Sequence, residues 1–273
     1  MQKNSPHIEI YQSGYCTANV KYSEPQQPSH KIKFYATWAL IRDQQMGNIL
    51  FDTGYSNRFF EGTRSFPSRI YRWITPVSYN ETESCKNLLS NIKIDHVIIS
   101  HFHADHVGGL IDFPDATIWC TKKEFEVAVS RKKSNGVFKG ILTNQIPDDL
   151  ASRVKHPELE YGKTQFGPLN GWSFTNNIHF ISLPGHTAGQ IGLLIQNSNI
   201  GDILLNADAS WSQKAVKEKI YPSKMVSLFI DSYSKLKVTI DKLHEFHQMY
   251  PEVKILPTHC IETAKLAINN DGI

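Results

Sequence analysis

Apolar residues in this chain gather in short runs that are separated by polar segments. The runs are rich in β-branched and aromatic residues and are bounded by Gly, Pro, Asn or Asp, which is the pattern of β-strands. We therefore predict strands at residues 8–11, 34–41, 48–51, 97–100, 116–120, 179–183, 191–195, 203–207 and 253–256.

Other segments carry apolar residues at the spacing of an amphipathic helix. In residues 232–250, Leu236, Ile240 and Leu243 recur at i, i+4 and i+7. Residues 81–92 and 147–154 are predicted as further helices. Early strands followed by mixed strands and helices predict an α/β protein whose sheets pack face to face with helices outside.

The composition fits an ordinary globular protein and excludes several other classes. Of the 273 residues, 40% are hydrophobic and 20% are charged. A net charge of +3 is too small to indicate a nucleic-acid partner, and no run reaches the roughly 18 apolar residues of a membrane span. The first residues lack the apolar core of a secretory signal, and the four cysteines form no Cys-x-x-Cys pair. We expect a cytoplasmic protein without a nucleic-acid or membrane partner.

Two long segments interrupt the order of elements, at about residues 55–79 and 132–171. The first combines aromatic and arginine side chains: Phe59, Phe60, Phe66, Tyr71, Trp73, Arg58, Arg64, Arg69 and Arg72. Insertions of this size often form lids, substrate walls or interfaces. We predict one domain over residues 1–273 with these two insertions. The first is expected to form a pocket wall or a homodimer interface, with a peripheral helix as the alternative.

The densest polar cluster follows the strand predicted at residues 97–100. His101, His103 and His106 accompany Asp105 within a run of six residues. Burying so many polar side chains together is costly unless something binds them. Imidazole nitrogen and carboxylate oxygen are donors that zinc and similar divalent metals accept. Because two metals about 3.5–4 Å apart form a hydrolytic centre, the cluster predicts a dinuclear metallohydrolase.

Three more polar side chains stand directly after predicted strands or turns: His186, Asp208 and His259. A hairpin of the strands that begin at residues 191 and 203 would place His186 and Asp208 at the same end. Asp208 could instead cap a helix. Strand ends are where sheets of this kind commonly bind ligands, so we predict that the three residues complete the metal site.

The chain resembles the metallo-β-lactamase superfamily in five motifs that occur in the family's order. They are Phe51-Asp52-Thr53-Gly54, His101-x-His103-x-Asp105-His106, Gly185-His186, Asp208 and His259. The resemblance implies an αββα sandwich of two mixed β-sheets flanked by helices, with the site at one edge. The implied ligands are His101, His103 and His186 for a first metal, Asp105, His106 and His259 for a second, and Asp208 as a bridge. Asp52 matches the family's aspartate that supports the site through hydrogen bonds.

The resemblance also narrows the reaction. Water activated between two metals attacks a carbonyl carbon or phosphorus, and Asp105 would orient it and pass a proton to the leaving group. Residues 204–210 resemble N-acyl homoserine lactonases, which carry a tyrosine where this chain has Trp211. An indole donates one hydrogen bond but lacks the acidic function of a phenol. We predict hydrolysis of a lactone or carboxylic ester, with Asp105 and Trp211 as the catalytic candidates.

The pattern leaves alternatives open. A glyoxalase II-type thioesterase or a phosphodiesterase keeps the same ligands, and a non-enzymatic metal-binding scaffold is a more distant alternative. Two zinc ions fit the ligands, while iron and manganese accept the same donors. We expect a small-molecule substrate, and the arginine and aromatic residues of the 55–79 insertion suggest that it is acidic or amphipathic.

Overall fold

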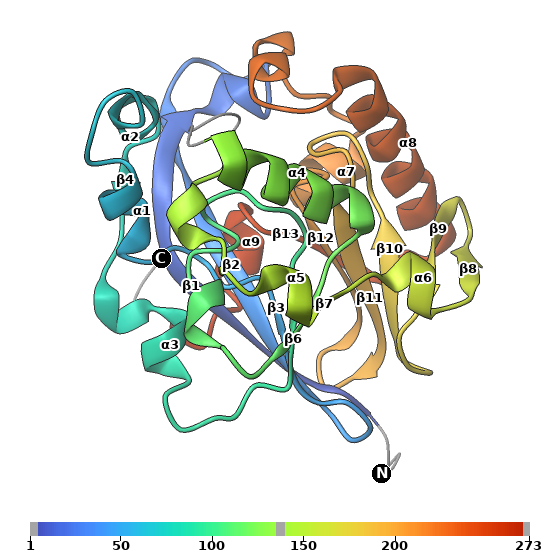
Figure 1. Ribbon diagram of the computed structural model, residues 1–273. Coiled ribbons are helices and arrows are strands. Elements are labelled where there is room, and N and C mark those ends of the chain that lie inside the picture. The colour runs from blue at the N-terminus through green and yellow to red at the C-terminus, as the bar shows by residue number, and fades with distance from the viewer. Residues whose placement is uncertain (1–4, 135–139, 270–273) are drawn as a thin grey trace.

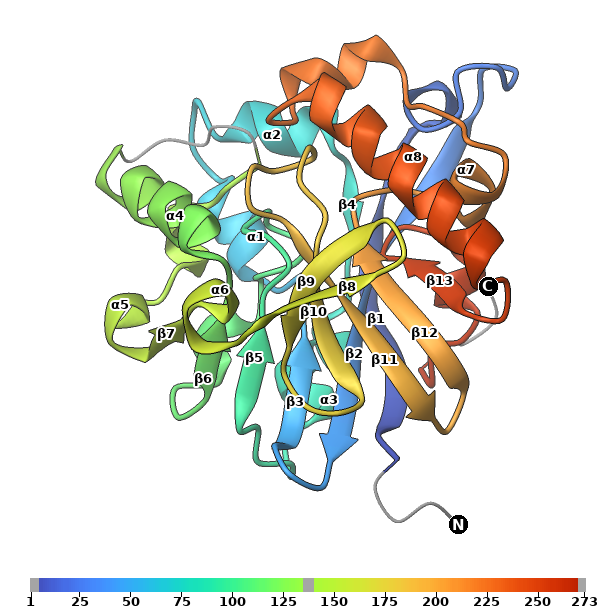
Figure 2. The ribbon, with the colours of Figure 1, turned by 90° about the vertical axis from the view of Figure 1, so that its right-hand side faces the viewer.

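The computed structural model describes residues 5–134 and 140–269 and contains two β-sheets packed face to face between layers of helices (Figures 1 and 2). Its strands are β1 (His7–Asn19), β2 (Lys31–Asp43), β3 (Gly47–Phe51), β4 (Val77–Ser78), β5 (His96–Ile98), β6 (Thr117–Trp119), β7 (Val154–Lys155), β8 (Lys163–Phe166), β9 (Leu169–Ser173), β10 (Ile178–Ser182), β11 (Ile191–Ser198), β12 (Gly201–Ala207) and β13 (Lys254–Pro257). The strand orders are β4-β1-β2-β3-β5-β6-β7 and β13-β12-β11-β10-β9-β8. Both sheets mix parallel and antiparallel pairs, so the predicted αββα sandwich is confirmed.

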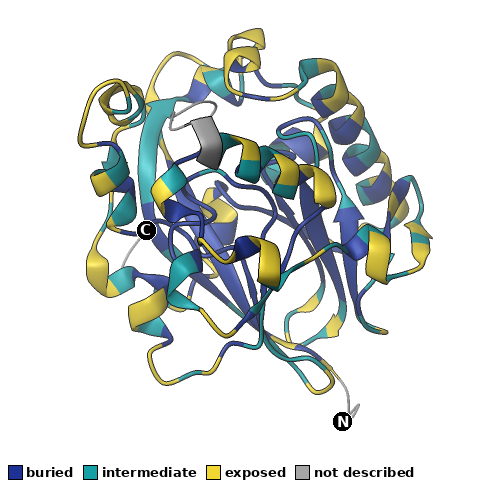
Figure 3. Ribbon diagram, in the orientation of Figure 1, coloured by how far each residue is buried: buried dark blue, intermediate teal, exposed yellow. Residues whose placement is uncertain are grey.

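All the predicted strands are present, and burial on both faces explains why the central ones are continuous apolar runs. Ile41 and Ile49 face the opposite sheet and pack in one cluster with Phe180, while the neighbouring Leu40 and Leu50 face the helical layer. Figure 3 shows this burial along the central strands. β4, β7 and β8 lie at sheet edges, and these strands and β9 lack long apolar runs, so the sequence pattern does not predict them.

The helices are α1 (Arg58–Gly62), α2 (Arg69–Ile74), α3 (Cys85–Leu88), α4 (Lys122–Ser134), α5 (Leu150–Arg153), α6 (Pro157–Glu160), α7 (Gln213–Lys217), α8 (Tyr233–Met249) and α9 (Ile261–Ala264). α8 confirms the helix predicted at 232–250 and lies across the sheet that contains β11 and β12 (Figure 2). The prediction of one continuous helix at 81–92 is wrong. A 3-10 turn at Glu81–Glu83 is followed by Ser84 in an extended conformation, which caps α3 as a separate helix. Among the described residues, no helix has the length and apolar character that a membrane crossing requires.

The two insertions are built into the edges of the sandwich. The first contains α1, α2 and β4, and β4 pairs with β1. Tyr71 of α2 packs on Phe59, with ring centroids 5.5 Å apart, whereas Phe66 and Trp73 are 77% and 67% exposed. Residues 135–139 of the second insertion lie outside the described residues. The rest of that insertion supplies β7 to one sheet and β8 and β9 to the other, so this part contributes to both sheets.

Candidate metal centre

The predicted ligand residues meet at one edge of the sandwich. β3 ends one residue before Asp52, β12 ends one residue before Asp208, and β13 ends two residues before His259. β5 leads into the loop of residues 101–106, and His186 lies in the loop between β10 and β11. β11 and β12 form the predicted hairpin, which puts His186 and Asp208 at the same end. The structure therefore brings residues from both sheets to a single place.

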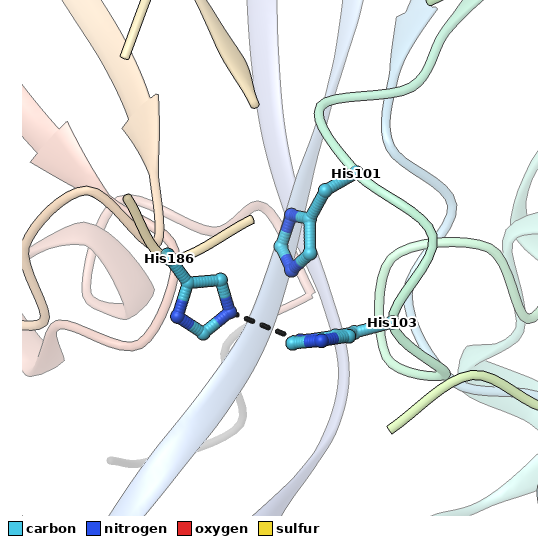
Figure 4. Close-up of side chains that lie close together, drawn as sticks. All are labelled: His101, His103 and His186. Carbon is cyan, nitrogen blue, oxygen red and sulfur yellow. Dashed lines mark hydrogen bonds between the residues drawn. The ribbon is translucent and has the colours of Figure 1, made fainter. Parts of the chain in front are cut away.

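Three histidines form the first group of ligand atoms. Figure 4 shows the rings of His101, His103 and His186 turned toward a common point. One nitrogen of each lies within 4.8 Å of the others. The ring centroids are 4.5 Å apart for His101 and His103 and 4.7 Å apart for His103 and His186, and His186 Nε2 lies 3.0 Å from His103 Nδ1. Three nitrogen donors around one point are a ligand set that a divalent metal accepts.

A second group of ligand atoms lies beside the first. Asp105, His106 and His259 also place one ligand atom each within 4.8 Å of one another. His259 Nε2 is 3.5 Å from Asp105 Oδ2. Asp208 lies between the groups, because its Oδ2 is 3.3 Å from His186 Nε2 and 3.0 Å from His259 Nε2. The arrangement corresponds to two adjacent sites that share one carboxylate.

The polar atoms at the centre of the cluster are suited to bind cations. His101 Nε2 is buried and makes no hydrogen bond to any residue that the structure describes. His106 Nε2 faces carboxylate oxygens of Asp208 at 3.2 Å and of Asp105 at 3.8 Å. Buried polar atoms nearly always have a partner, and a bound cation would supply one here. The donor set of imidazole nitrogens and carboxylate oxygens fits a pair of divalent ions.

Hydrogen bonds behind the ligands fix their orientation. Asp52 is fully buried and accepts hydrogen bonds from the backbone N–H and the hydroxyl of Ser100, each at 2.8 Å. Its carboxylate also lies 2.7 Å from His106 Nδ1. His259 Nδ1 similarly lies 2.8 Å from the carbonyl oxygen of Tyr35. Contacts at Nδ1 turn Nε2 of each ring toward the centre, so Asp52 lies where a supporting aspartate would act.

The loop that carries His101, His103 and His106 packs closely against the residues that follow β3. The N–H of Gly108 donates to the carbonyl oxygen of Gly54 at 3.0 Å, and Thr53 N–H donates to the carbonyl oxygen of His106 at 2.8 Å. A Cβ at residue 108 would overlap the Gly54 carbonyl, so the close approach requires glycine. Asp52 has a φ of 59°, in the left-handed region that aspartate and asparagine tolerate better than most residues.

Electrostatics divide the histidines into two sets. Burial lowers the pKa of His101 and His186 well below the usual range and lowers the pKa of His103 to about 4. Burial acts in the same direction on His106, but three nearby carboxylates, with Asp52 the strongest, outweigh it and hold the pKa of His106 well above its usual value. The first set is therefore neutral and able to bind a cation, whereas His106 must release a proton when a metal binds.

Trp211 is half-buried beside the shared carboxylate. Its Nε1–H donates to Asp208 Oδ2 at 3.4 Å, and its ring centroid lies 6.0 Å from that of His186 in an edge-to-face arrangement. Phe34 packs on the same indole at 6.4 Å. The indole N–H is thus directed at Asp208, and a contact between Trp211 and a substrate stays a prediction.

One residue next to the site is absent from the predicted set. Glu124 of α4 is 1% exposed, and its Oε1 accepts hydrogen bonds from Thr187 Oγ1 at 2.5 Å and from the Gly189 N–H at 2.8 Å. These donors lie one and three residues after His186. In the sequence, Glu124 stands in Thr121-x-x-Glu124, the capping-box pattern, which indicates a helix N-terminus and not a contact with the loop of His186.

Comparison with known proteins gives the class to which this fold and site belong. The sequence profile of the metallo-beta-lactamase superfamily matches residues 33–200, which is more than half of the chain. The chain therefore belongs to the metallo-β-lactamase superfamily, as its motifs indicate.

Its similar relatives are lactonases. The N-acyl homoserine lactonase AiiA of Bacillus thuringiensis subsp. kurstaki is 21% identical over 218 residues, which cover 78% of this chain and 79% of AiiA. An N-acyl homoserine lactonase of Bacillus cereus is 24% identical over 221 residues, covering 75% and 76%. An N-acyl homoserine lactone hydrolase, solved with the product N-hexanoyl-L-homoserine at its catalytic metal centre, has a TM-score of 0.74 at 19% identity and covers 96% of both chains. The dizinc quorum-quenching lactonase AidC has a TM-score of 0.62 at 17% identity, covering 95% and 89%.

Proposed function

We propose that this chain is a dinuclear metal-dependent hydrolase that opens the lactone ring of N-acyl homoserine lactones. The observation that carries the proposal is the pair of adjacent His and Asp groups that share Asp208. Such a pair of sites is suited to hydrolysis. The relatives supply the substrate class, because AiiA and the Bacillus cereus protein are lactonases and one similar structure holds a ring-opened product.

Each ion has its own ligands in this proposal. They are His101, His103 and His186 for one ion, Asp105, His106 and His259 for the other, and Asp208, which contacts His186 and His259, for both. Zinc is the proposed metal because AidC is a dizinc enzyme with the same fold, and iron and manganese accept the same donors. When bound, the pair of ions makes a nearby water more acidic and polarises the carbonyl group that is attacked.

Asp105 is placed to move the proton that the reaction releases. Its Oδ2 lies 3.5 Å from His259 Nε2 and 3.8 Å from His106 Nε2, and the residue is 8% exposed. A carboxylate oxygen there can accept a proton from the attacking water and deliver it to the ring oxygen, which leaves as an alcohol. Asp105→Asn keeps an oxygen ligand but removes the base. We expect bound metal to remain and kcat to fall about 10²–10⁴-fold, and unchanged turnover would exclude this role.

A hydrolysis panel separates this proposal from the alternatives. Protein whose metal content has been measured is assayed on N-acyl homoserine lactones, aryl esters, thioesters and phosphodiesters. We expect about two bound metals and the highest kcat/KM on lactones. A preference for thioesters would favour a glyoxalase II-type enzyme, a preference for phosphodiesters a phosphodiesterase, and one tightly held ion without turnover a metal-binding scaffold.

Two aspartate variants on one hairpin provide the control for this panel. Asp208→Ala removes the shared ligand, and we expect it to abolish both lactone hydrolysis and the binding of two ions. Asp202→Ala changes a half-buried aspartate of β12 that accepts a hydrogen bond from Asn197 N–H, away from the ligand cluster. It should remain active. An Asp208→Ala protein as active as the parent would overturn the assignment.

The proposal also includes the cellular location and the oligomeric state of the protein. A cytoplasmic location is supported by the four cysteines, which are all free thiols: Cys16, Cys85, Cys120 and Cys260. A homodimer through the 55–79 insertion is supported by the exposed aromatic side chains of Phe66 and Trp73. Light scattering of the purified protein measures the oligomeric state, and a monomer at all concentrations would exclude this dimer.

A further inference from the structure

The first turn of α4 holds the loop that carries His186. Glu124 Oε1 accepts hydrogen bonds from the Gly189 N–H at 2.8 Å and from Thr187 Oγ1 at 2.5 Å. Thr121 Oγ1 donates to the carbonyl oxygen of Gly189 at 2.8 Å. Both backbone polar groups of Gly189 are therefore bound by side chains of one helix start.

This contact requires a close approach of the loop to the helix. A Cβ at Gly189 would overlap Thr121 Oγ1 and would lie 3.0 Å from the Glu124 backbone nitrogen. Thr121 Oγ1 also accepts from the Glu124 N–H at 3.3 Å, as an N-cap side chain does. In a capping box, the glutamate three residues later turns back to its own helix. Here the Glu124 carboxylate instead extends to another segment of the chain.

The same carboxylate lies close to the second ligand loop. Burial raises the pKa of Glu124, while the bonds from Thr187 and Gly189 and the backbone N–H of Phe102 act against this increase. Phe102 stands between His101 and His103. One buried side chain therefore binds the loop of His186 directly and is affected electrostatically by the loop of His101 and His103.

The loop with His186 has a second anchor on the opposite side. The N–H of Asp231 donates to the carbonyl oxygen of His186 at 2.8 Å, and the N–H of Ser232 donates to that of Gly185 at 2.9 Å. These backbone contacts do not depend on Glu124. Loss of the Glu124 carboxylate would thus leave the backbone contacts with Asp231 and Ser232 in place and weaken the contact with α4, where only the bond from Thr121 to Gly189 remains.

We propose that Glu124 is a positioning residue that sets the distance of His186 from His101 and His103 and so controls the affinity of the metal site that these three form. The inference rests on the proposed dinuclear site. It predicts an effect on one of the two sites, whereas a residue that stabilises only the fold would affect both sites or neither.

The test measures zinc affinity by competition with a chelator in two single-site backgrounds. His259→Ala leaves the three-histidine group complete, and His186→Ala leaves the Asp105, His106 and His259 group complete. We expect Glu124→Leu to lower zinc affinity about 10–100-fold in the first background and to leave it unchanged in the second. Glu124→Gln, which keeps an acceptor oxygen, should recover most of the affinity. Glu126→Leu, at an exposed position of α4, is the matched control and should behave as the parent does.

The outcomes separate this inference from the proposed function. A parent protein that binds fewer than two zinc ions refutes the proposed function. A parent that binds two, with full affinity in the His259→Ala, Glu124→Leu protein, refutes the positioning role. Equal losses in both backgrounds, accompanied by a lower unfolding temperature of the metal-free protein, also refute it. If Glu124→Leu does not fold, Thr187→Val replaces it, and the absence of a few-fold loss confined to the three-histidine site then overturns the inference.

Discussion

The substitution Asp52→Asn tests how hydrogen bonds to the ligand residues control the metal affinity of the proposed site. Asp52 is fully buried, accepts two hydrogen bonds from Ser100 and lies 2.7 Å from His106 Nδ1. Asparagine has nearly the same volume and adopts the left-handed backbone of residue 52 about as readily as aspartate does. The fold is therefore expected to survive this substitution, so that its effect on the site can be measured.

The expected loss follows from the tautomer of His106. When His106 is neutral, its Nδ1–H donates a hydrogen bond to the Asp52 carboxylate, which leaves the Nε2 lone pair directed at the site. An asparagine that keeps its oxygen on Ser100 N–H presents its amide N–H groups to Nδ1, and an N–H group cannot accept a hydrogen bond. The ring is then driven to the tautomer with the proton on Nε2, which cannot bind a cation. Such changes typically lower metal affinity about 10–100-fold, or about 1.4–2.8 kcal/mol at roughly 1.4 kcal/mol per factor of ten.

The assay combines chelator competition with thermal unfolding of the metal-free protein. Asp52→Asn should lose affinity at the site that His106 completes and should unfold close to the parent temperature. Asp115→Asn, at an exposed position, serves as the control and should match the parent. Parent affinity at both sites would refute the tautomer argument. A large drop in the unfolding temperature would show that Asp52 acts on the fold itself.

Three smaller predictions use other parts of the molecule. Trp211→Phe keeps an aromatic ring but removes the indole N–H, so steady-state kinetics should show kcat/KM on lactones about tenfold lower, as for the loss of a hydrogen bond of about 1–1.5 kcal/mol; an unchanged value would exclude a role of the N–H in turnover. The pKa of Asp95 is lowered, first by the bond from Lys93 and then by the Asn48 N–H, so its stabilising effect is present above its unfolded-state pKa and is lost as the pH falls through its folded-state pKa. Denaturant titrations should therefore show a larger stability difference between the parent and Asp95→Asn at about pH 6 than at about pH 2, and a difference independent of pH would contradict this. Gly171→Ala would place a Cβ onto the Phe180 carbonyl oxygen and should cost about 1–3 kcal/mol in urea unfolding; a variant as stable as the parent would argue against the pairing of β9 with β10.

The sequence predicts those elements whose burial is strongest. Central strands such as β5 and β12 are buried on both faces and appear as apolar runs, whereas the edge strand β8 alternates half-buried and exposed residues and has no such run. In residues 81–92 the pattern instead predicts one long helix that the structure does not contain. Leu88, Leu89 and Ile92 have helical spacing, but the hydroxyl of Ser84 accepts from Asn87 N–H and starts a new, short helix. Local capping here outweighs the hydrophobic period.

The candidate site also contains residues that the sequence predicts and one residue that it does not predict. The clustering of the candidate ligand residues could be predicted because metal chemistry permits few residue types and because these residues follow strands or turns. Glu124 could not be found in this way, because Thr121-x-x-Glu124 has a complete local meaning as a helix start. Its contact with Thr187 and Gly189 exists only after two segments more than sixty positions apart have been brought together by the fold.

Each proposed ion takes ligands from both sheets of the sandwich. The loop after β5 supplies His101 and His103, and the loop after β10 supplies His186, while Asp105 and His106 of the first sheet meet His259 of the second. A cation in either site would therefore join the two sheets at this edge. Because the separated ligands of an unfolded chain cannot form these sites, bound metal stabilises the folded state, by about 2.7 kcal/mol at a free concentration of about 100 times Kd. The proposed ions would thus both supply the chemistry and hold together the edge of the sandwich on which it depends.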